Sequence, residues 1–361
     1  MIGNLQLLRG LAALAVVFYH TNYRFAGGVH SDFQGVAVFF VISGFIMTFI
    51  SRANADFFMV RRIIRVAPIY WVATLAFFFI EICAFSTDHA VAWWNYQSNA
   101  KHLVKSLLFV PYQNGNGAMQ PLLPVGWTLN LEIFYYFLFF VALKISHRFA
   151  PLITFGALFV LWAVKPQSEL LGFYSGQYTL FFCFGILAYY AWQFFDSRVT
   201  MSWRRPLLIA AVVYGGIYVA MSASEQAVDL AAKVPAGAYL PWLMPPGLIC
   251  LALLMHSAML RTSQKFFLVL GDASYSLYLT HLIVLQQLAQ LGGAFPLLDF
   301  KASIVGVLFA LVAATVVAVA VFYLIERPLH RLLTMPFRRP ANMGDLGGLQ
   351  HGAVTNPLPH R

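Results

Sequence analysis

The sequence predicts an all-α protein, a polytopic bundle of about ten transmembrane helices with both termini in the cytoplasm. Of its 361 residues, 60% are hydrophobic and only 10% are charged, and the mean hydropathy is +0.73. Soluble domains have about 25% charged residues, so this composition excludes a soluble globular protein. Apolar runs long enough to cross a bilayer then recur along the whole chain.

Ten apolar runs are candidates for membrane-spanning helices, and the fifth is short for a span. They cover about Leu5–Tyr23, Gly35–Ile50, Val66–Phe85, Leu122–Leu143, Pro151–Val164, Tyr178–Phe195, Pro206–Met221, Trp242–Leu260, Phe267–Leu291 and Ala302–Ile325. A shorter run at Leu103–Val110 is amphipathic and ends at Pro111, so we expect it to be interfacial or re-entrant. Residues 1–334 are predicted to form one transmembrane domain, and the Pro/Gly-rich residues 335–361 a disordered cytoplasmic tail.

The distribution of basic residues predicts the orientation. With the N-terminus in the cytoplasm, 17 of the 23 Lys and Arg residues fall on the cytoplasmic side and 6 on the outer side. Cytoplasmic loops of membrane proteins carry such an excess, and an odd number of spans would destroy it. The net charge of +10 is therefore explained by orientation, and we expect no nucleic acid partner. The three cysteines have neither pairing nor ligand spacing, so we expect no metal site.

The first run carries two ionisable residues, Arg9 and His20. Ionisable groups within a span are costly and mark functional sites. Eleven residues turn a helix by about 1100°, about 20° past three turns, and rise about 16 Å, so both side chains share one face at different depths. The alternative is that Arg9 reaches the membrane surface and His20 bonds to a neighbouring helix.

Two further motifs follow the second run. Ser43 and Gly44 interrupt its apolar sequence, which favours close helix packing over a catalytic serine. Arg62 and Arg65 then lie three residues apart and share a helical face, a spacing that suits a clamp for polyphosphates. Ordinary anchoring of the protein at the cytoplasmic membrane surface explains the same arginines equally well.

Two more ionisable residues lie within later runs. Glu132 is near the outer end of the fourth run, and His281 is in the outer half of the ninth, above a strip of hydroxyl residues. We therefore expect two layers: an inner cationic layer of Arg9, Arg62, Arg65 and a further candidate, Arg327, and an outer layer of His20, Glu132 and His281. This arrangement suits a polyanionic donor held from the cytoplasm and an acceptor that reacts deeper or on the far side.

These segments, in this order, resemble the acyltransferase type 3 family of bacterial integral membrane O-acyltransferases. The resemblance extends from Leu5 to about Pro328 and is carried by the segments LLRGLAALAVVFYH, GVAVFFVISGFIM, RRIIRVAPIYW, VGWTLNLEIFYYF, GDASYSLYLTH and ERP. It implies transfer of an acyl group, typically acetyl from acetyl-CoA, to a sugar hydroxyl of a surface or exported glycan. The expected place is the bacterial inner membrane, beside glycan-synthesis machinery, with a lipid-linked sugar as one form of the acceptor.

The resemblance also implies roles for residues. Arg9 and His20 match the family's first-helix arginine and histidine, and the histidine is regarded as the catalytic base. Arg62 and Arg65 match the arginine pair associated with the acyl-CoA phosphates, so Arg9, Arg62 and Arg65 are expected to hold acyl-CoA. Glu132 lies in a matching Trp–Glu stretch. Beside what the resemblance implies, we expect Glu132 and His281 to be catalytic residues together with His20: a carboxylate or a second histidine can orient the base, and Glu132 or His281 would shape the acceptor site.

Other classes explain part of the pattern. A transporter of an anionic or glycan substrate would use the same intramembrane charges, but the chain shows no evident inverted repeat. A transferase that uses a polyprenyl-phosphate sugar would need an acidic pair in an outer loop, where only the isolated Asp32 and Asp88 occur. A structural protein would leave the buried charges unexplained. Direct transfer and an acyl-histidine intermediate both remain open.

Overall fold

The computed structural model describes residues 3–23, 35–53, 57–85, 100–115, 117–196, 247, 265–292, 295, 299–301 and 303–337. Within these ranges every regular element is helical, apart from an isolated bridge between Gln113 and Met119. The all-α class is thus confirmed. The seventh predicted span lies outside the described residues, as do the eighth apart from residue 247 and the predicted tail beyond residue 337. The count of ten spans and the domain division therefore stay predictions.

Five segments of the described chain are long and apolar enough to cross a membrane. They contain α2 (Gly35–Ala53), α3 (Phe58–Phe85), α5 (Trp127–Ile145), α8 (Tyr178–Asp196) and α14 (Ile304–Val321). On α14, Leu308, Val312 and Val316 are each more than half exposed. Apolar side chains in such a row require lipid rather than water around them, and the chain is a membrane protein.

The remaining helices are shorter or carry more polar residues. They are α1 (Gly3–His20), α4 (Ala100–Leu107), α6 (Ala150–Val164), α7 (Glu169–Tyr174), α12 (Lys265–Asp272), α13 (Ser274–Gly292), α15 (Arg327–Thr334) and the short turns η1 (Pro124–Gly126), η5 (Phe322–Glu326) and η6 (Met335–Phe337). The eight residues of α4 cannot span a bilayer. α4 is tied to α3 by Trp71 Nε1, which donates to Leu107 O at 2.8 Å.

Two predicted boundaries are corrected. The third helix begins at Phe58 rather than Val66, because its first two turns are helical although they carry the arginines, and it continues through Pro68. The ninth run is divided at Ala273 into α12 and α13. Hydrophobicity alone marks where a segment is apolar, so it misses a polar first turn and a break inside an apolar run.

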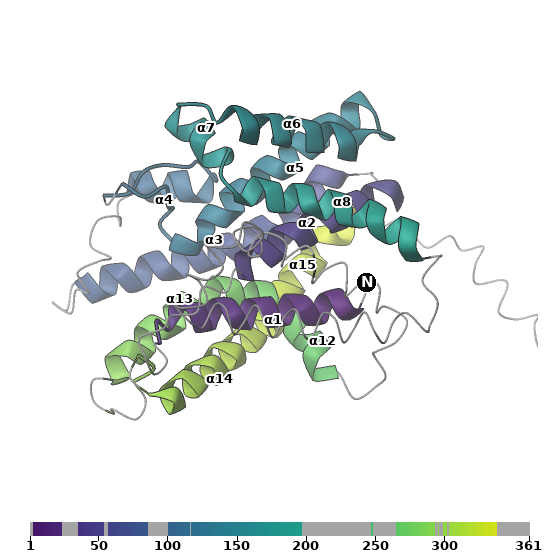
Figure 1. Ribbon diagram of the computed structural model, residues 1–361. Coiled ribbons are helices and arrows are strands. Elements are labelled where there is room, and N and C mark those ends of the chain that lie inside the picture. Colours follow the sequence, from purple (N-terminus) through teal and green to yellow (C-terminus); the bar gives the residue numbers. More distant parts are fainter. Residues whose placement is uncertain are drawn as a thin grey trace, which may run out of the picture.

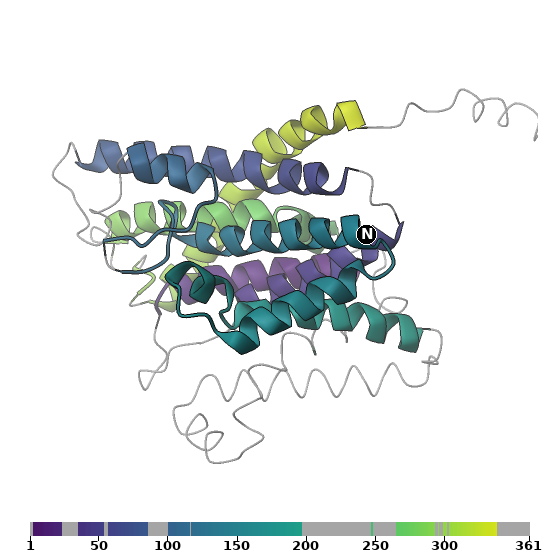
Figure 2. The ribbon, with the colours of Figure 1, turned by 90° about the horizontal axis from the view of Figure 1, so that it is seen from above.

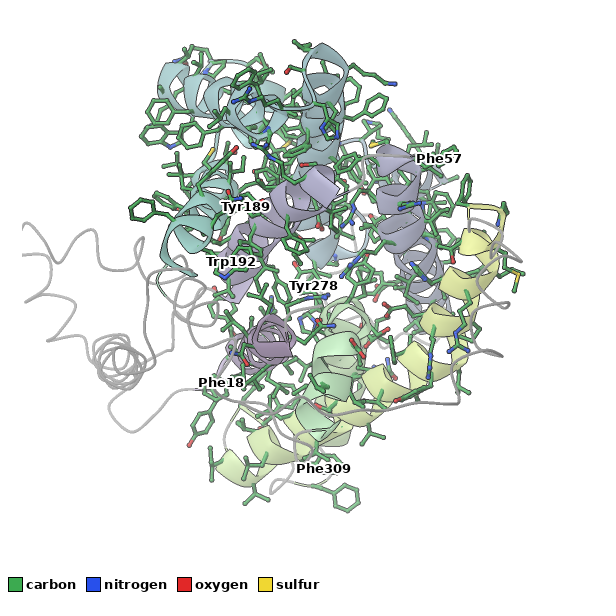
Figure 3. All side chains as sticks on the ribbon, turned by 90° about the vertical axis from the view of Figure 1, so that its right-hand side faces the viewer. Phe18, Phe57, Tyr189, Trp192, Tyr278 and Phe309 are labelled. Atoms are coloured by element: carbon green, nitrogen blue, oxygen red, sulfur yellow. The ribbon has the colours of Figure 1, made fainter. Side chains whose placement is uncertain are left out.

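The long helices form a ring. α1 packs against α2 and α13, α3 packs against α13 and α5, and α8 and α6 connect α2 to α5. Figures 1 and 2 show these helices running side by side, with α14 beneath α1 and α13, and with α6 and α8 on the opposite side. In the end-on view of Figure 3, Tyr278 lies near the centre of the bundle, whereas Phe309 of α14 lies at its edge. The interior of the ring is where the polar residues of α1, α3, α5 and α13 can meet.

Glycines let α2 and α8 approach closely. A Cβ on Gly44 would meet the carbonyl oxygen of Phe182, and a Cβ on Gly185 would meet the carbonyl oxygen of Val41. Backbone atoms cannot move aside as a flexible side chain can, so only glycine fits this crossing. The packing interpretation is confirmed for Gly44.

We predict that Gly185→Ala destabilises the protein, because the added methyl forces α2 and α8 apart. Overpacking of this kind costs about 1–3 kcal/mol, which lowers the thermal unfolding midpoint of the detergent-solubilised protein. Gly156→Ala is the matched control, because a Cβ on Gly156 in α6 meets nothing within 4 Å. Equal unfolding midpoints for the two variants would contradict the close crossing.

Candidate functional site

Two cavities are lined by helices of the described part of the ring. The first, which we call the arginine cavity, has a volume of about 90 Å³ and is lined by Arg9, Arg62 and Arg65 together with residues of α2, α5 and α13. The second, the histidine cavity, has a volume of about 500 Å³ and includes His20 in its wall. Val36 and Tyr278 line both cavities. Arg9, Arg62 and Arg65 therefore face one space and His20 faces an adjoining one, whereas His281 lines neither.

The arginine cavity brings together cations from α1 and α3. Arg9 and Arg62 are only 8% and 9% exposed. Within the described part of the chain, Arg62 Nε has no hydrogen-bond partner, although it is buried. A buried donor without a partner costs free energy, and a cavity wall with three arginines, one of which has such a donor, suits an anionic ligand.

The position of Arg9 is fixed from its own helix and from α12. Its Nη1 donates to Gln6 Oε1 at 3.1 Å, and Gln6 Nε2 donates to Asp272 Oδ1 at 2.6 Å. The Asp272 carboxylate thus acts on Arg9 through the Gln6 amide. Arg9 also lines the cavity, and the carboxylates of Glu326 and Glu132 are near enough to interact with its charge.

The structure corrects the expected position of Glu132. This residue lines the arginine cavity and is absent from the described wall of the histidine cavity. It accepts hydrogen bonds from Ser43 Oγ at 3.1 Å and from the hydroxyl of Tyr136. The physical reason is that α5 begins deep in the bundle. Thr128, in the first turn of α5, contacts Tyr278, which is only four residues from the start of α13. Glu132 lies one turn further along α5 and so reaches the depth of the arginines.

The structure brings His20 and His281 together from opposite ends of the chain. His281 Nε2 lies 3.3 Å from His20 Nδ1, and the ring centroids are 4.9 Å apart. His281 is fully buried, whereas His20 is partly exposed. This contact is the connection between α1 and α13 that the expected outer layer requires.

Backbone carbonyls determine the tautomers of this pair. His20 Nδ1 lies 2.8 Å from Val16 O, and His281 Nδ1 lies 3.2 Å from Leu277 O. A carbonyl only accepts, so each Nδ1 carries the proton and each Nε2 keeps a lone pair. The single His20 Nδ1–H is then shared between Val16 O at 2.8 Å and His281 Nε2 at 3.3 Å, and His20 Nε2 is left as a proton acceptor.

Tyr278 is the centre of a small hydroxyl network between the cavities. Its hydroxyl lies 2.9 Å from Thr128 Oγ1 and donates to Val125 O at 3.1 Å. Tyr275, one turn earlier, lines the arginine cavity and donates to Val66 O at 2.8 Å. Sequence reasoning predicted a polar strip here but assigned no role to either tyrosine. The signal was present, because Tyr275, Tyr278 and His281 recur every three residues on one face of α13.

Glu326 is the last residue of the π-helical turn η5, and Arg327 is the first residue of α15. Glu326 is partly buried and accepts from Ser276 Oγ at 2.5 Å, whereas Arg327 is exposed and lies over the ring of Tyr323. Arg327 therefore does not join the arginine cavity. In the described residues no group of three His, Cys, Asp or Glu side chains could hold a metal ion.

A family model described as an acyltransferase domain matches residues 2–326. The exopolysaccharide production protein ExoZ of Rhizobium meliloti is 27% identical over 332 residues, which cover 86% of this chain and 92% of ExoZ. The O-acetyltransferase OatA of Staphylococcus aureus is 26% identical over 303 residues, which cover 76% of this chain and 49% of OatA.

A shorter match is with the putative peptidoglycan O-acetyltransferase YrhL of Bacillus subtilis, 32% identical over 149 residues, 37% of this chain and 22% of YrhL. The match thus spans about half the length of OatA and nearly all of ExoZ. No solved structure matches the chain.

Proposed function

The chain belongs to the acyltransferase domain family and is an O-acyltransferase, and we propose that it transfers acetyl from acetyl-CoA to a sugar hydroxyl of a surface or exported glycan. The observation that carries this proposal is the pair of adjoining cavities, one cationic and one with a histidine in its wall. The names of ExoZ and OatA support an exported polysaccharide as acceptor and acetyl as the group transferred.

The arginine cavity is the proposed donor site. Acyl-CoA carries a diphosphate and a ribose phosphate, and guanidinium groups bind phosphate oxygens with paired, charge-assisted hydrogen bonds. Arg62, with its unpartnered Nε, and Arg65 would bind the phosphates from α3. Arg9, held by Gln6, would complete the site, and Glu132 would offset part of its positive charge.

The histidine cavity is the proposed acceptor site. Besides His20 its described wall contains Trp127, Tyr178 and Gln120, which offer aromatic faces and an amide to a sugar ring. His20 Nε2 would take the proton of the attacking hydroxyl as its oxygen forms a bond to the thioester carbonyl carbon. The C–S bond then breaks, and CoA leaves as the thiol with the proton from the imidazolium. Donor and acceptor react directly in this scheme, without an acyl-histidine.

His281 is the proposed positioning residue for His20. Val16 O already fixes the tautomer of His20. By sharing the same Nδ1–H, His281 Nε2 would hold the orientation of the imidazole ring, one of the parts that the third member of a catalytic triad plays. Its burial keeps this partner in place.

The proposed location is the bacterial inner membrane, with the arginine cavity open towards the cytoplasm. Acyl-CoA is a cytoplasmic metabolite, and the excess of basic residues favours the same orientation. Glycan-synthesis machinery would supply the acceptor, either lipid-linked or already exported.

We predict that Arg62→Ala and Arg65→Ala each raise the KM for acetyl-CoA by about 10- to 100-fold, because each removes charged hydrogen bonds to phosphate. Steady-state kinetics of the purified protein in liposomes measures this. Arg61→Ala is the matched control, since it removes the same charge from the same turn but does not line the cavity. An equal rise in KM for Arg61→Ala would indicate membrane anchoring instead.

We predict that His281→Leu lowers kcat by about 10- to 100-fold and leaves the KM for acetyl-CoA unchanged, because only the orientation of His20 is lost. His281→Gln restores part of the rate, since its amide oxygen can accept from Nδ1–H. His102→Ala, which removes a histidine stacked on Tyr112 outside both cavities, should keep the wild-type rate. Wild-type kcat for His281→Leu would refute the positioning role.

A further inference from the structure

The wall shared by the two cavities carries an inference about which acyl groups the enzyme accepts. We propose that Val36 and Tyr278 form the passage between the arginine cavity and the histidine cavity, and that this passage selects short acyl groups. The inference rests on the proposed function, because it assumes that acyl-CoA enters from the arginine side. It adds a selectivity determinant for the transferred group.

The position of the passage follows from the cavity walls. Among the described residues, Val36 and Tyr278 are the two that line both cavities. The thioester carbonyl has to reach the acceptor hydroxyl at His20, so the acyl group of a donor held by the arginines comes to lie between these two side chains. There the C–S bond breaks and the new C–O ester bond forms, while the hydroxyl proton leaves on CoA through His20.

One wall of the passage is rigid. The Tyr278 hydroxyl is held by Thr128 and Val125, and its ring lies against Phe39 with centroids 5.9 Å apart. Tyr278 is only 7% exposed. Moving the ring aside would break buried hydrogen bonds, so a longer acyl group cannot make room here at low cost.

The other wall is held by the start of α2. Gly35, next to Val36, is so close to α1 that a Cβ there would lie 2.7 Å from Ala12 O. α2 therefore cannot retreat towards α1 when a larger group enters. The width of the passage is set by the side chain at position 36, and one methylene in such an apolar contact changes selectivity by about 10- to 200-fold.

The test compares kcat/KM for acetyl-CoA, propionyl-CoA and butyryl-CoA, with purified protein in liposomes and a glycan acceptor. Val36→Ala widens the passage and should raise the ratio of butyryl to acetyl transfer at least tenfold. Val36→Ile narrows it and should lower the ratio of propionyl to acetyl transfer. Val41→Ala is the matched control, because Val41 is fully buried on the same helix and lines neither cavity. It should leave both ratios unchanged.

The outcomes separate this inference from the proposed function. Unchanged ratios in both Val36 variants, with acetyl transfer still measurable, would overturn the passage alone. A shift in Val41→Ala equal to that in Val36→Ala would also overturn it, because the effect would then arise from general loosening of α2. Wild-type protein that transfers no acyl group from any of the three donors would overturn the proposed donor, and the passage with it.

Discussion

The burial of arginine inside a membrane bundle is the constraint on which this structure depends. A guanidinium taken out of water is unfavourable unless polar groups or a ligand surround it. Arg9 and Arg62 are nine-tenths buried, and the groups around them come from several helices: Gln6 on α1, Asp272 on α12 and Glu132 on α5. These helices are far apart in the chain. The need to surround these cations with polar groups therefore explains why polar residues from several helices meet in the interior of the ring.

The two helices that carry most of the site, α1 and α13, contain the polar residues that are least suited to contact with lipid. α1 and α13 are not among the five segments apolar enough to cross a membrane on composition, because they carry Arg9, His20, the tyrosines and His281. The apolar α2 packs beside α1, and the apolar α14 packs beside both α1 and α13. Along both helices the side chains pass from the arginine cavity to the histidine cavity, so one ring interior can bind an anion at one depth and hold a base at another.

Much of this was predictable from sequence. The pairing of Arg9 with His20 on one face follows from helical geometry, and the convergence of Arg62 and Arg65 follows from their spacing of three. For His20 and His281 the sequence predicted only that both lie at a similar depth in the membrane. Their contact could not be predicted, because 261 residues separate them. The position of Glu132 was not predictable, since it depends on α5 starting deep in the bundle beside Tyr278. The position of Val36 and Tyr278 in the wall shared by the two cavities depends on side-chain packing, which the periodicity of the sequence does not reveal.

The most direct test is transfer of a radiolabelled acetyl group from acetyl-CoA to glycan extracts by the purified protein in liposomes, with wild type beside His20→Ala and with acetyl-CoA binding measured on both. If the arginines hold the donor and His20 acts as the base, both proteins bind acetyl-CoA. Only the wild type then forms an alkali-labile ester. Equal ester formation by His20→Ala, or no binding of acetyl-CoA by the wild type, would contradict this account.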